Sequence, residues 1–377
     1  MANLLGTGTT LLDDSPRSAP TRGVAAGGVL VVAVVFVVVL LWAKWIPYAS
    51  KAAHVSGTHT WSGSSIMGVG GVHAGDAPSW HAATTFTRAY VSAIWKALAA
   101  ALLLSSAIQA LLSRGLLLRV MNRESRVQSA VIGGLVSTPS MMCTCCTAPV
   151  ASTLRRDGVS SSAAVAYWLG NPLLNPAVLV FLAFVAPWQW TLTRLVLGIA
   201  LVVGGSALVS RLTDRPAPAG AVDQLTGAEA LGAPSAPSDS ADWLAQAPAR
   251  FGRALLRLTL TLLPEYLVVV MLIGAFRGWL FPLGRDHLHT GIIVVLIAAV
   301  LGTLLVIPTA GEIPILQGLA VAGLSLGGVG ALLITLPAAS LPGMAMVWRA
   351  FGWRLTLGVA ALVAVGGVAG GALLSAL

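Results

Sequence analysis

The sequence predicts an all-α integral membrane protein, an inverted-repeat transporter with about seven spanning helices and two re-entrant broken hairpins. Three observations lead to this fold class. The 377 residues are 56% hydrophobic and 9% charged, whereas a soluble domain has about 25% charged residues. Several apolar segments are long enough to cross a bilayer. Two others, 127–154 and 291–322, are apolar but are interrupted by Pro, Gly and polar residues.

A spanning helix needs about 20 mostly apolar residues. The segments that meet this requirement are 23–43, 89–113, 160–186, 191–210, 255–280, 326–348 and 353–376. The first has no clear small-x-small cleavage site, so we interpret it as a retained signal anchor and not as a cleaved signal peptide. An alternative with eight or nine spans stays open, because 291–308 alone is long enough to cross.

Arginines between the apolar segments predict the orientation, since short basic loops stay in the cytoplasm. The loop 114–126 and the polar segment 211–254 each carry four arginines, and we place both inside. The uncharged link Pro187–Trp190 is placed outside. Because Arg155 and Arg156 then also belong inside, the segment 127–154 begins and ends on the cytoplasmic face, which makes it a hairpin.

The expected domain order follows from these assignments. The polar segment 211–254 is rich in Pro, Ala and Ser and has too few apolar residues to form a buried core, so we predict a disordered linker. The predicted order is a cytoplasmic tail 1–22, a signal-anchor helix 23–43, an extracytoplasmic loop 44–87, a first transmembrane repeat 88–210, the cytoplasmic linker 211–254 and a second transmembrane repeat 255–377.

An internal repeat relates the two halves. Pro149, Gly158, Ser160 and Pro172 recur as Pro314, Gly323, Ser325 and Pro337, and each pair is 165 residues apart (314 − 149, 323 − 158, 325 − 160, 337 − 172). With one short gap, the match extends to Trp190–Arg194 and Trp353–Arg354. An odd number of spans separates the two hairpins, so the halves have opposite orientations. Inverted repeats with broken helices are typical of secondary transporters.

All three cysteines, Cys143, Cys145 and Cys146, lie within the first broken segment. In a continuous helix Cys143 and Cys146 would share a face and Cys145 would point away, so only a locally unwound chain brings all three to one ion. Soft thiolates favour soft species such as Cu(I), Zn(II) and, by the same logic, trivalent arsenic. The alternatives are inert packing and, because Cys143 to Cys146 is C-x-x-C, a membrane thiol-disulfide oxidoreductase.

Polar residues inside apolar segments are further candidates, because they are costly in a bilayer. Lys96 and Glu265 lie on helices that the repeat equates, so we expect them to form an ion pair with a coupling or structural role; snorkelling is the alternative for Lys96. Glu312 lies opposite the cysteines in the repeat alignment and is a candidate for binding the solute, a cation or a proton. Asn171 and Asn175 interrupt a span, and they either brace the cysteine hairpin or contribute oxygen ligands.

The cysteine segment also carries a family resemblance. Thr138-Pro-Ser-Met-Met-Cys-Thr-Cys-Cys-Thr-Ala-Pro-Val150, with Arg156-Asp-Gly158 and Gly170-Asn-Pro-Leu-Leu-Asn175 after it, resembles the predicted permease family that includes the ArsP-type organoarsenical efflux permeases and related copper/zinc exporters. The likeness covers roughly 88–377. It implies efflux of a thiophilic solute, with Cys143 and Cys145 as ligands of a metal ion or arsenical. Cys146 replaces the glycine that is usual in the family.

The predicted function is therefore that of a multi-pass permease of the cell membrane, which exports a trivalent arsenical or a soft metal ion by secondary transport. We expect no enzymatic activity and no cofactor, and no nucleotide-binding G-x-x-x-x-G-K-[ST] loop occurs. The expected partners are the lipid bilayer and the small solute. The net charge of +9 comes from clusters that flank spans, which argues against nucleic acid. A non-transporting scaffold or sensor is a further alternative, and the sequence does not indicate the oligomeric state.

Overall fold

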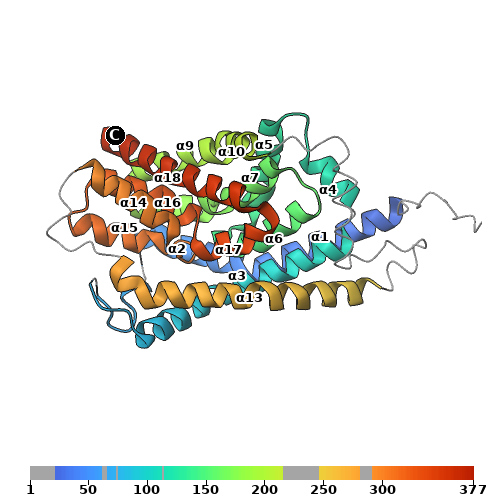
Figure 1. The fold of residues 1–377 in the computed structure, drawn as a ribbon, viewed down its shortest axis with the longest axis horizontal. Coiled ribbons are helices and arrows are strands. Elements are labelled where there is room, and N and C mark those ends of the chain that lie inside the picture. The colour runs from blue at the N-terminus through green and yellow to red at the C-terminus, as the bar shows by residue number, and fades with distance from the viewer. Residues whose placement is uncertain (1–21, 62–65, 74, 113, 215–245, 281–290) are drawn as a thin grey trace, which may run out of the picture.

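A computed structural model describes residues 22–61, 66–73, 75–112, 114–214, 246–280 and 291–377 (Figure 1). Within these ranges the chain forms helices and no strand. The expected tail up to residue 21 and linker residues 215–245 lie outside the described ranges. The ends of the expected linker are described, and they are helical.

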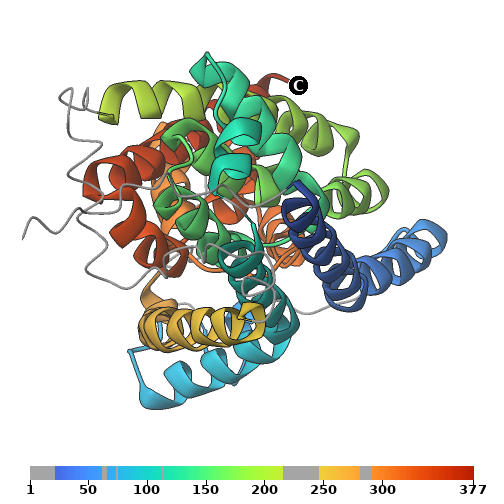
Figure 2. The same ribbon diagram turned by 90° about the vertical axis from the view of Figure 1, so that its right-hand side faces the viewer.

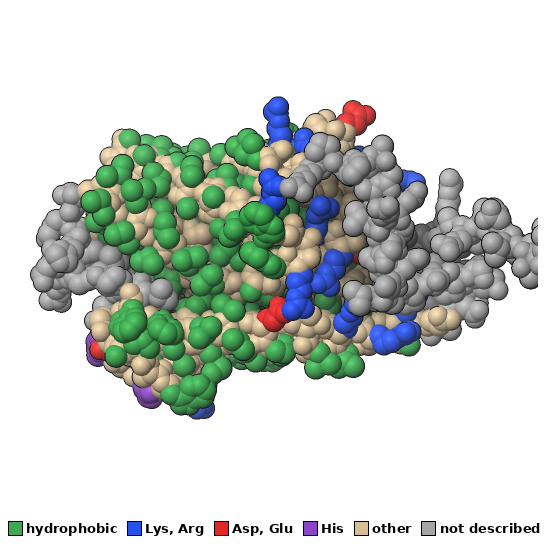
Figure 3. Space-filling model, viewed as in Figure 1, with side chains coloured by type: hydrophobic (Ala, Val, Ile, Leu, Met, Phe, Trp, Pro, Cys, Tyr) green, Lys and Arg blue, Asp and Glu red, His purple; other side chains and the backbone are tan. Residues whose placement is uncertain are grey.

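The number of spans agrees with the sequence. Among the described residues, six helical stretches are long and apolar enough to cross a membrane, and the bent pair α16 (Leu326–Ala338) and α17 (Leu341–Phe351), counted as one span, makes a seventh. Apolar side chains are spread over the left and centre of the face in Figure 3, and large ones such as Leu30 and Ile292 are exposed on helices. A surface of this kind fits lipid and not water. The all-α integral membrane architecture is confirmed.

The first spanning helix is longer than expected. α1 (Arg22–Leu40) runs through a π-helical turn at Leu41–Trp45 into α2 (Ile46–Thr58). Pro47 follows closely on the π-helical turn and does not end the helix. The expected loop 44–87 was therefore too long: α3 (Trp80–Leu111) starts at Trp80, with the Ser79 side chain as its N-cap.

Two long helices lie side by side along one flank of the molecule. They are α3 and α13 (Ala247–Leu280), and they run in opposite directions (Figures 1 and 2). The Phe86 and Tyr90 rings of α3 stack, and Tyr90 contacts Tyr266 of α13 with ring centroids 6.3 Å apart. These helices form one wall beside the two hairpins.

Both broken segments form hairpins. In the first, α5 (Arg126–Ser137) ends in a 3-10 turn at Thr138–Ser140, and α6 (Thr144–Arg156) returns. In the second, α14 (Ile292–Leu304) is followed by irregular chain and then by α15 (Glu312–Val321). The two hairpins enter the molecule from opposite ends (Figure 1).

The remaining elements follow the same order in both halves. After the short α4 (Arg114–Met121) and the first hairpin come α7 (Ser161–Leu173), α8 (Pro176–Val185), α9 (Trp188–Ile199), a π-helical turn at Ala200–Gly205 and α10 (Ser206–Thr213). After the second hairpin come α16, α17 and α18 (Trp353–Ala376). In each half, a broken span and a final span thus follow the hairpin.

Local geometry reproduces the repeat at its 165-residue offset. Gly158 and Gly323 have φ of 91° and 96°, a left-handed conformation that suits glycine and ends α6 and α15. The next helices begin with equivalent N-caps: Ser160 accepts a hydrogen bond from the N–H of Ala163, and Ser325 accepts one from Gly328. The two halves therefore share one backbone design.

One detail of the sequence alignment was wrong. α9 begins at Trp188 and α18 at Trp353, so the 165-residue offset continues (353 − 188) without the gap that paired Trp190 with Trp353. Under the ungapped register Arg194 corresponds to Val359 and not to Arg354. Arg194 and Val359 are both fully buried, so Arg194 is an internal residue and not a membrane-flanking one.

Arginine-bearing turns from distant parts of the chain meet at one end of the molecule, which we call the basic end. The Arg114 side chain donates to the Asp157 carbonyl over 2.8 Å, and Ser161 donates to Asp214 over 2.7 Å. Arg156 lies near Arg257 and Arg349. Figure 3 shows Lys and Arg side chains gathered on this end. The loops that charge counting assigned to one side of the membrane thus lie together.

Candidate functional site

The chain is unwound just before α6, the helix that contains Cys145 and Cys146. Met141 has φ of 49°, and Cys143 is extended (φ −82°, ψ 168°) as the N-cap of α6. Cys145 and Cys146 belong to the first turn of that helix. The expected local unwinding is therefore present at residues 141–143. Pro149 does not take part in it, because it lies inside α6.

This unwinding brings the three thiols together. The Cys143 sulfur lies 3.1 Å from the Cys145 sulfur and 3.1 Å from the Cys146 sulfur, and the last two are 3.9 Å apart. All three residues are buried and none forms a disulfide. In the described part of the chain they make up the one group of three or more His, Cys, Asp or Glu side chains spaced to hold a single ion. We call it the thiol cluster.

The spacing suits one soft centre. Zinc–sulfur bonds of about 2.3 Å in tetrahedral geometry place sulfurs about 3.8 Å apart. The observed distances of 3.1 to 3.9 Å therefore require only sub-ångström shifts. The cluster also stands at the N-terminus of α6, where the helix dipole favours negative charge such as that of thiolates.

Asn171 braces the unwound segment. Its side-chain oxygen accepts hydrogen bonds from the Ser140 hydroxyl over 2.5 Å and from the Met142 N–H over 2.9 Å. Trp168, on the same helix α7, donates to the Thr144 carbonyl over 3.0 Å. Of the two roles expected for Asn171, the structure provides the contacts for bracing.

Asn175 has a different place. Its side-chain oxygen caps α8 by accepting from the N–H groups of Ala177 and Val178. The side-chain nitrogens of Asn171 and Asn175 are buried, and neither has a hydrogen-bond partner among the described residues. Each nitrogen therefore remains available as a donor.

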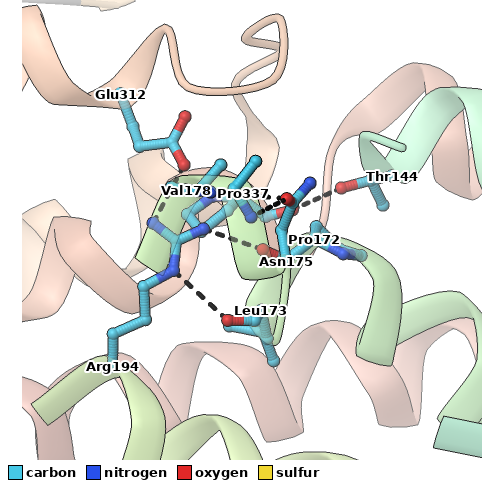
Figure 4. Close-up of polar contacts among 9 residues, drawn as sticks. Thr144, Pro172, Leu173, Asn175, Val178, Arg194, Glu312 and Pro337 are labelled. Carbon is cyan, nitrogen blue, oxygen red and sulfur yellow. Dashed lines mark hydrogen bonds and ion pairs between the residues drawn. The ribbon is translucent and has the colours of Figure 1, made fainter. Parts of the chain in front are cut away.

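The break between α7 and α8 leaves carbonyl groups without helical partners. Pro176 has no N–H to offer to the Pro172 carbonyl, and the Ala177 N–H is already bound to Asn175. The Arg194 guanidinium reaches these carbonyls from α9, with 2.7 Å to Pro172 O and 3.3 Å to Leu173 O (Figure 4).

Arg194 also holds the tip of the second hairpin. Its Nη1 lies 2.9 Å from the Glu312 carboxylate, and both side chains are almost completely buried. Glu312 is the first residue of α15, where a negative charge also suits the helix dipole. Within the described residues, no contact joins Glu312 to the thiols, so the geometry gives it an ion-pair partner and not a place in the thiol cluster.

The expected Lys96–Glu265 pair does not form. Glu265 forms an ion pair with Arg349 of α17, while the Lys96 ammonium lies 5.8 Å from the ring centroids of Trp42 and Trp95. The repeat places Lys96 and Glu265 on equivalent helices, but it does not determine which residues their side chains contact. The structure therefore separates these two candidates from each other and from the thiols.

Side chains that the sequence interpretation did not select complete the surroundings of the thiol cluster. The Tyr90 hydroxyl lies 3.3 Å from the Cys145 sulfur, and the Tyr266 hydroxyl lies 3.8 Å from it. Lys44, 6% exposed, interacts electrostatically with Cys143 and Cys146 and donates to Tyr48 over 2.9 Å and to Thr309 over 3.2 Å. Arg194 and Lys44 were detectable as charges within or beside apolar runs, but the sequence interpretation did not select either of them as a site residue.

Comparison with known proteins places the chain in a family. A family model described as a predicted permease, ArsP_1, matches residues 79–376. The chain belongs to this permease family. The permease is also 40% identical over 344 residues to the UPF0718 protein YraQ of Escherichia coli (strain K12), across 90% of this chain and 94% of that protein. No solved structure matches it.

The family match confirms the resemblance found in the sequence. It covers both hairpins and begins within one residue of α3. Together with the six or seven candidate spans in the described part of the chain, this match makes the permease a multi-pass membrane protein of a transporter family.

Proposed function

We propose that the permease exports a thiophilic solute, a trivalent arsenical or a soft metal ion, from the cytoplasm by secondary transport. The observation that carries this proposal is the convergence of three buried sulfurs at the tip of a broken hairpin, in a member of a permease family. Thiolates retain soft centres in preference to hard cations. Irregular backbone is tolerated at membrane depth where it lines a site or is covered by protein.

The direction of transport rests on the basic end. The positive-inside rule predicts that the arginine-bearing turns face the cytoplasm. The first hairpin then starts on the cytoplasmic side with α5 and returns to it at the end of α6, and the thiol cluster takes up its solute from the cytoplasm. The second hairpin enters from the opposite end. Alternate opening of the two ends would then carry the solute outward, as in other inverted-repeat transporters.

The cross-repeat contacts support such a mechanism. Thr144, beside the thiols, donates to the Pro337 carbonyl of α16 over 2.5 Å, and Arg194 joins Glu312 to the Pro172 carbonyl of α7. Each hairpin tip is thus tied to the broken span of the other repeat (Figure 4). Movement at one tip is expected to change the packing at the other.

The test is a resistance assay in cells that lack their own efflux systems. Cells with the wild-type permease should survive higher doses of at least one of arsenite, methylarsenite, copper and zinc, and they should accumulate less of it. Cys143→Ser/Cys145→Ser should abolish both effects, while Thr147→Ser in the same hairpin should retain them. Normal resistance and accumulation with the double variant would refute the role of the thiols.

Purified permease in liposomes separates transport from other activities. Uptake of the identified solute into vesicles should require Cys143 and Cys145. If no solute crosses although the protein is folded, a scaffold or sensor role is favoured instead.

A thiol-disulfide oxidoreductase is the second candidate, favoured by the 3.1 Å separation of the Cys143 and Cys146 sulfurs. A disulfide needs about 2.05 Å, so only a small movement would close it. Mass spectrometry after titration across a range of redox potentials is the test. A Cys143–Cys146 disulfide that forms reversibly would favour this candidate, and its absence throughout would exclude it.

A further inference from the structure

A cavity of about 430 Å³ lies between the first spanning helix, α3 and the break of the second hairpin. Lysines reach it from two helices: Lys44 and Lys51 from the first spanning helix and Lys96 from α3. Aromatic side chains, among them Tyr48, Trp61 and Trp95, form its walls. No Asp or Glu lines it in the described part of the chain. We call it the lysine cavity.

The three ammonium groups have aromatic neighbours in place of carboxylates. Lys51 lies 3.5 Å from the centroid of Trp61, Lys44 lies 4.9 Å from that of Tyr48, and Lys96 lies 5.8 Å from that of Trp95. No ion pair involves any of them among the described residues. Lys44 is buried, Lys51 is partly buried and Lys96 is exposed. A charge buried inside a membrane protein is normally paired, so Lys44 with two further cations at the same cavity leaves a positive charge uncompensated.

Lys44 connects the lysine cavity to the thiol cluster. It lies in the π-helical turn Leu41–Trp45, a distortion often found at functional sites. Trp45 of the same turn donates to the Pro139 carbonyl of the first hairpin over 2.8 Å, and the Lys44 ammonium donates to Thr309, which belongs to the break of the second hairpin. A solute bound by the thiols would thus lie beside the cavity.

We propose that the lysine cavity binds an anionic group of the cargo, so that the transported solute is a thiophilic centre that bears a carboxylate or a comparable anion, and not a bare metal cation. The proposal rests on the role of the thiols proposed above. The three ammonium groups repel a free cation, whereas they donate charge-assisted hydrogen bonds to carboxylate oxygens. The aromatic walls suit the apolar part of such a molecule.

The test compares two ligands that differ by one carboxylate, phenylarsine oxide and 4-carboxyphenylarsine oxide. Each forms two arsenic–sulfur bonds with two thiols and releases one water, with no change of oxidation state. Purified full-length permease in nanodiscs is incubated with each ligand, and the remaining reactivity of the cysteines toward a maleimide is measured by mass spectrometry. The carboxylated ligand should protect the thiols at a concentration at least about tenfold lower.

Variants then assign the preference to the cavity. Lys51→Gln/Lys96→Gln, which leaves Lys44 in place, should lower the ratio of protecting concentrations severalfold without weakening the neutral ligand. Lys51→Arg/Lys96→Arg should keep the ratio, which also guards against a misfolded Gln variant. Arg354→Gln is the matched control, since Arg354 lies over Trp353 at 5.9 Å but does not line the cavity.

Equal protection by the two ligands in the wild-type protein, or a preference that Lys51→Gln/Lys96→Gln leaves undiminished, would overturn the proposal. If neither ligand protects the thiols, the proposed function fails instead. In that case calorimetric titration with benzoate tests the cavity alone. Benzoate binding that is lost in Lys51→Gln/Lys96→Gln supports an anion site, and no benzoate binding by the wild-type protein refutes the anion site.

Discussion

The two hairpin tips have the same backbone setting but different chemistry. Gly158 and Gly323 end the returning helices in the same conformation, and Ser160 and Ser325 cap the helices that follow. The first tip nevertheless presents three thiols braced by a neutral amide, whereas the second presents Glu312 bound to Arg194. The repeat therefore determines where a site lies, and the residues at each tip determine what the site can bind.

The carbonyls that end the broken spans show the same contrast. Pro172 and Pro337 are equivalent, 165 residues apart (337 − 172). Arg194 supplies the donor to Pro172 and the Thr144 hydroxyl supplies the donor to Pro337. A charged contact thus replaces a neutral one at matching places, which predicts that the two tips differ in their sensitivity to substitution.

Loss of the Glu312 charge should have the largest effect on stability. Glu312→Gln leaves the Arg194 guanidinium buried without a counter-charge, which costs about 3–5 kcal/mol. We expect a correspondingly lower denaturation midpoint in detergent, measured by tryptophan fluorescence. In a double-mutant cycle, adding Arg194→Gln should cost less than the sum of the single changes.

The Glu265–Arg349 pair provides the control, because its side chains are 32% and 61% exposed. Glu265→Gln should cost at most about 1 kcal/mol, since solvent screens an exposed pair. Equal losses for Glu312→Gln and Glu265→Gln would show that burial of the Arg194–Glu312 pair is not important for stability.

The sequence predicted the arrangement of spans and hairpins more completely than the residues around the thiol cluster and the second hairpin tip. Apolar length, arginine placement and the 165-residue offset sufficed for the spans and both hairpins, because these depend on composition along the chain. Arg194 was missed because only three-dimensional packing shows that it points inward at Glu312. Lys44 was missed because the hydrophobic run ends beside it, while the helix continues to Thr58.

Replacing the brace of the first hairpin should have the next largest effect. Asn171→Leu introduces the residue found at the equivalent position, Leu336, and removes the acceptor for the Met142 N–H and the Ser140 hydroxyl. Buried donors without acceptors cost about 1–3 kcal/mol. The unwound segment should open more often, so Cys143 should react faster with a maleimide.

Asn175→Ser is the matched control, because serine also serves as the N-cap of α8, introduces no charge and leaves the contacts of Asn171 intact. Its labelling rate should equal that of the wild-type protein. If Asn171→Leu leaves the rate of Cys143 labelling unchanged, the amide does not hold the thiol segment in place.

The paired glycines offer a smaller and more exacting comparison. Alanine in the left-handed conformation costs about 1–2 kcal/mol, so Gly158→Ala and Gly323→Ala should both destabilise the protein. Gly158→Ala should cost more, because its Cβ would lie 3.0 Å from the Arg114 side chain, whereas nothing lies within 4 Å at Gly323. Chemical denaturation of both variants measures the difference, and a larger loss for Gly323→Ala would contradict it.

The smallest expected effect concerns a carboxyl group present in only one repeat. Burial raises the pKa of Asp157 to about 6, and Arg114 and Arg156 only partly offset this rise. Below pH 3.8, the ordinary value, the group is protonated in the folded and unfolded states alike. As the pH rises through 6, the folded protein must ionise a partly buried carboxyl group, and stability is lost. Asp157→Asn should therefore change little at pH 4 and stabilise by up to about 1 kcal/mol at pH 8, after allowance for solvent at this turn.

The second repeat supplies the counterpart for this measurement, since Ala322 is the position equivalent to Asp157 (322 − 157 = 165). Ala322 is exposed, so Ala322→Asp places a carboxylate in water, and the free energy of unfolding should hardly respond to pH. A stabilisation by Asp157→Asn that is the same at pH 4 and pH 8 would mean that the carboxyl group is not titrating in the folded protein. A pH dependence confined to position 157 would instead show that the arginines and the burial of the basic end, and not the shared turn, shift its ionisation.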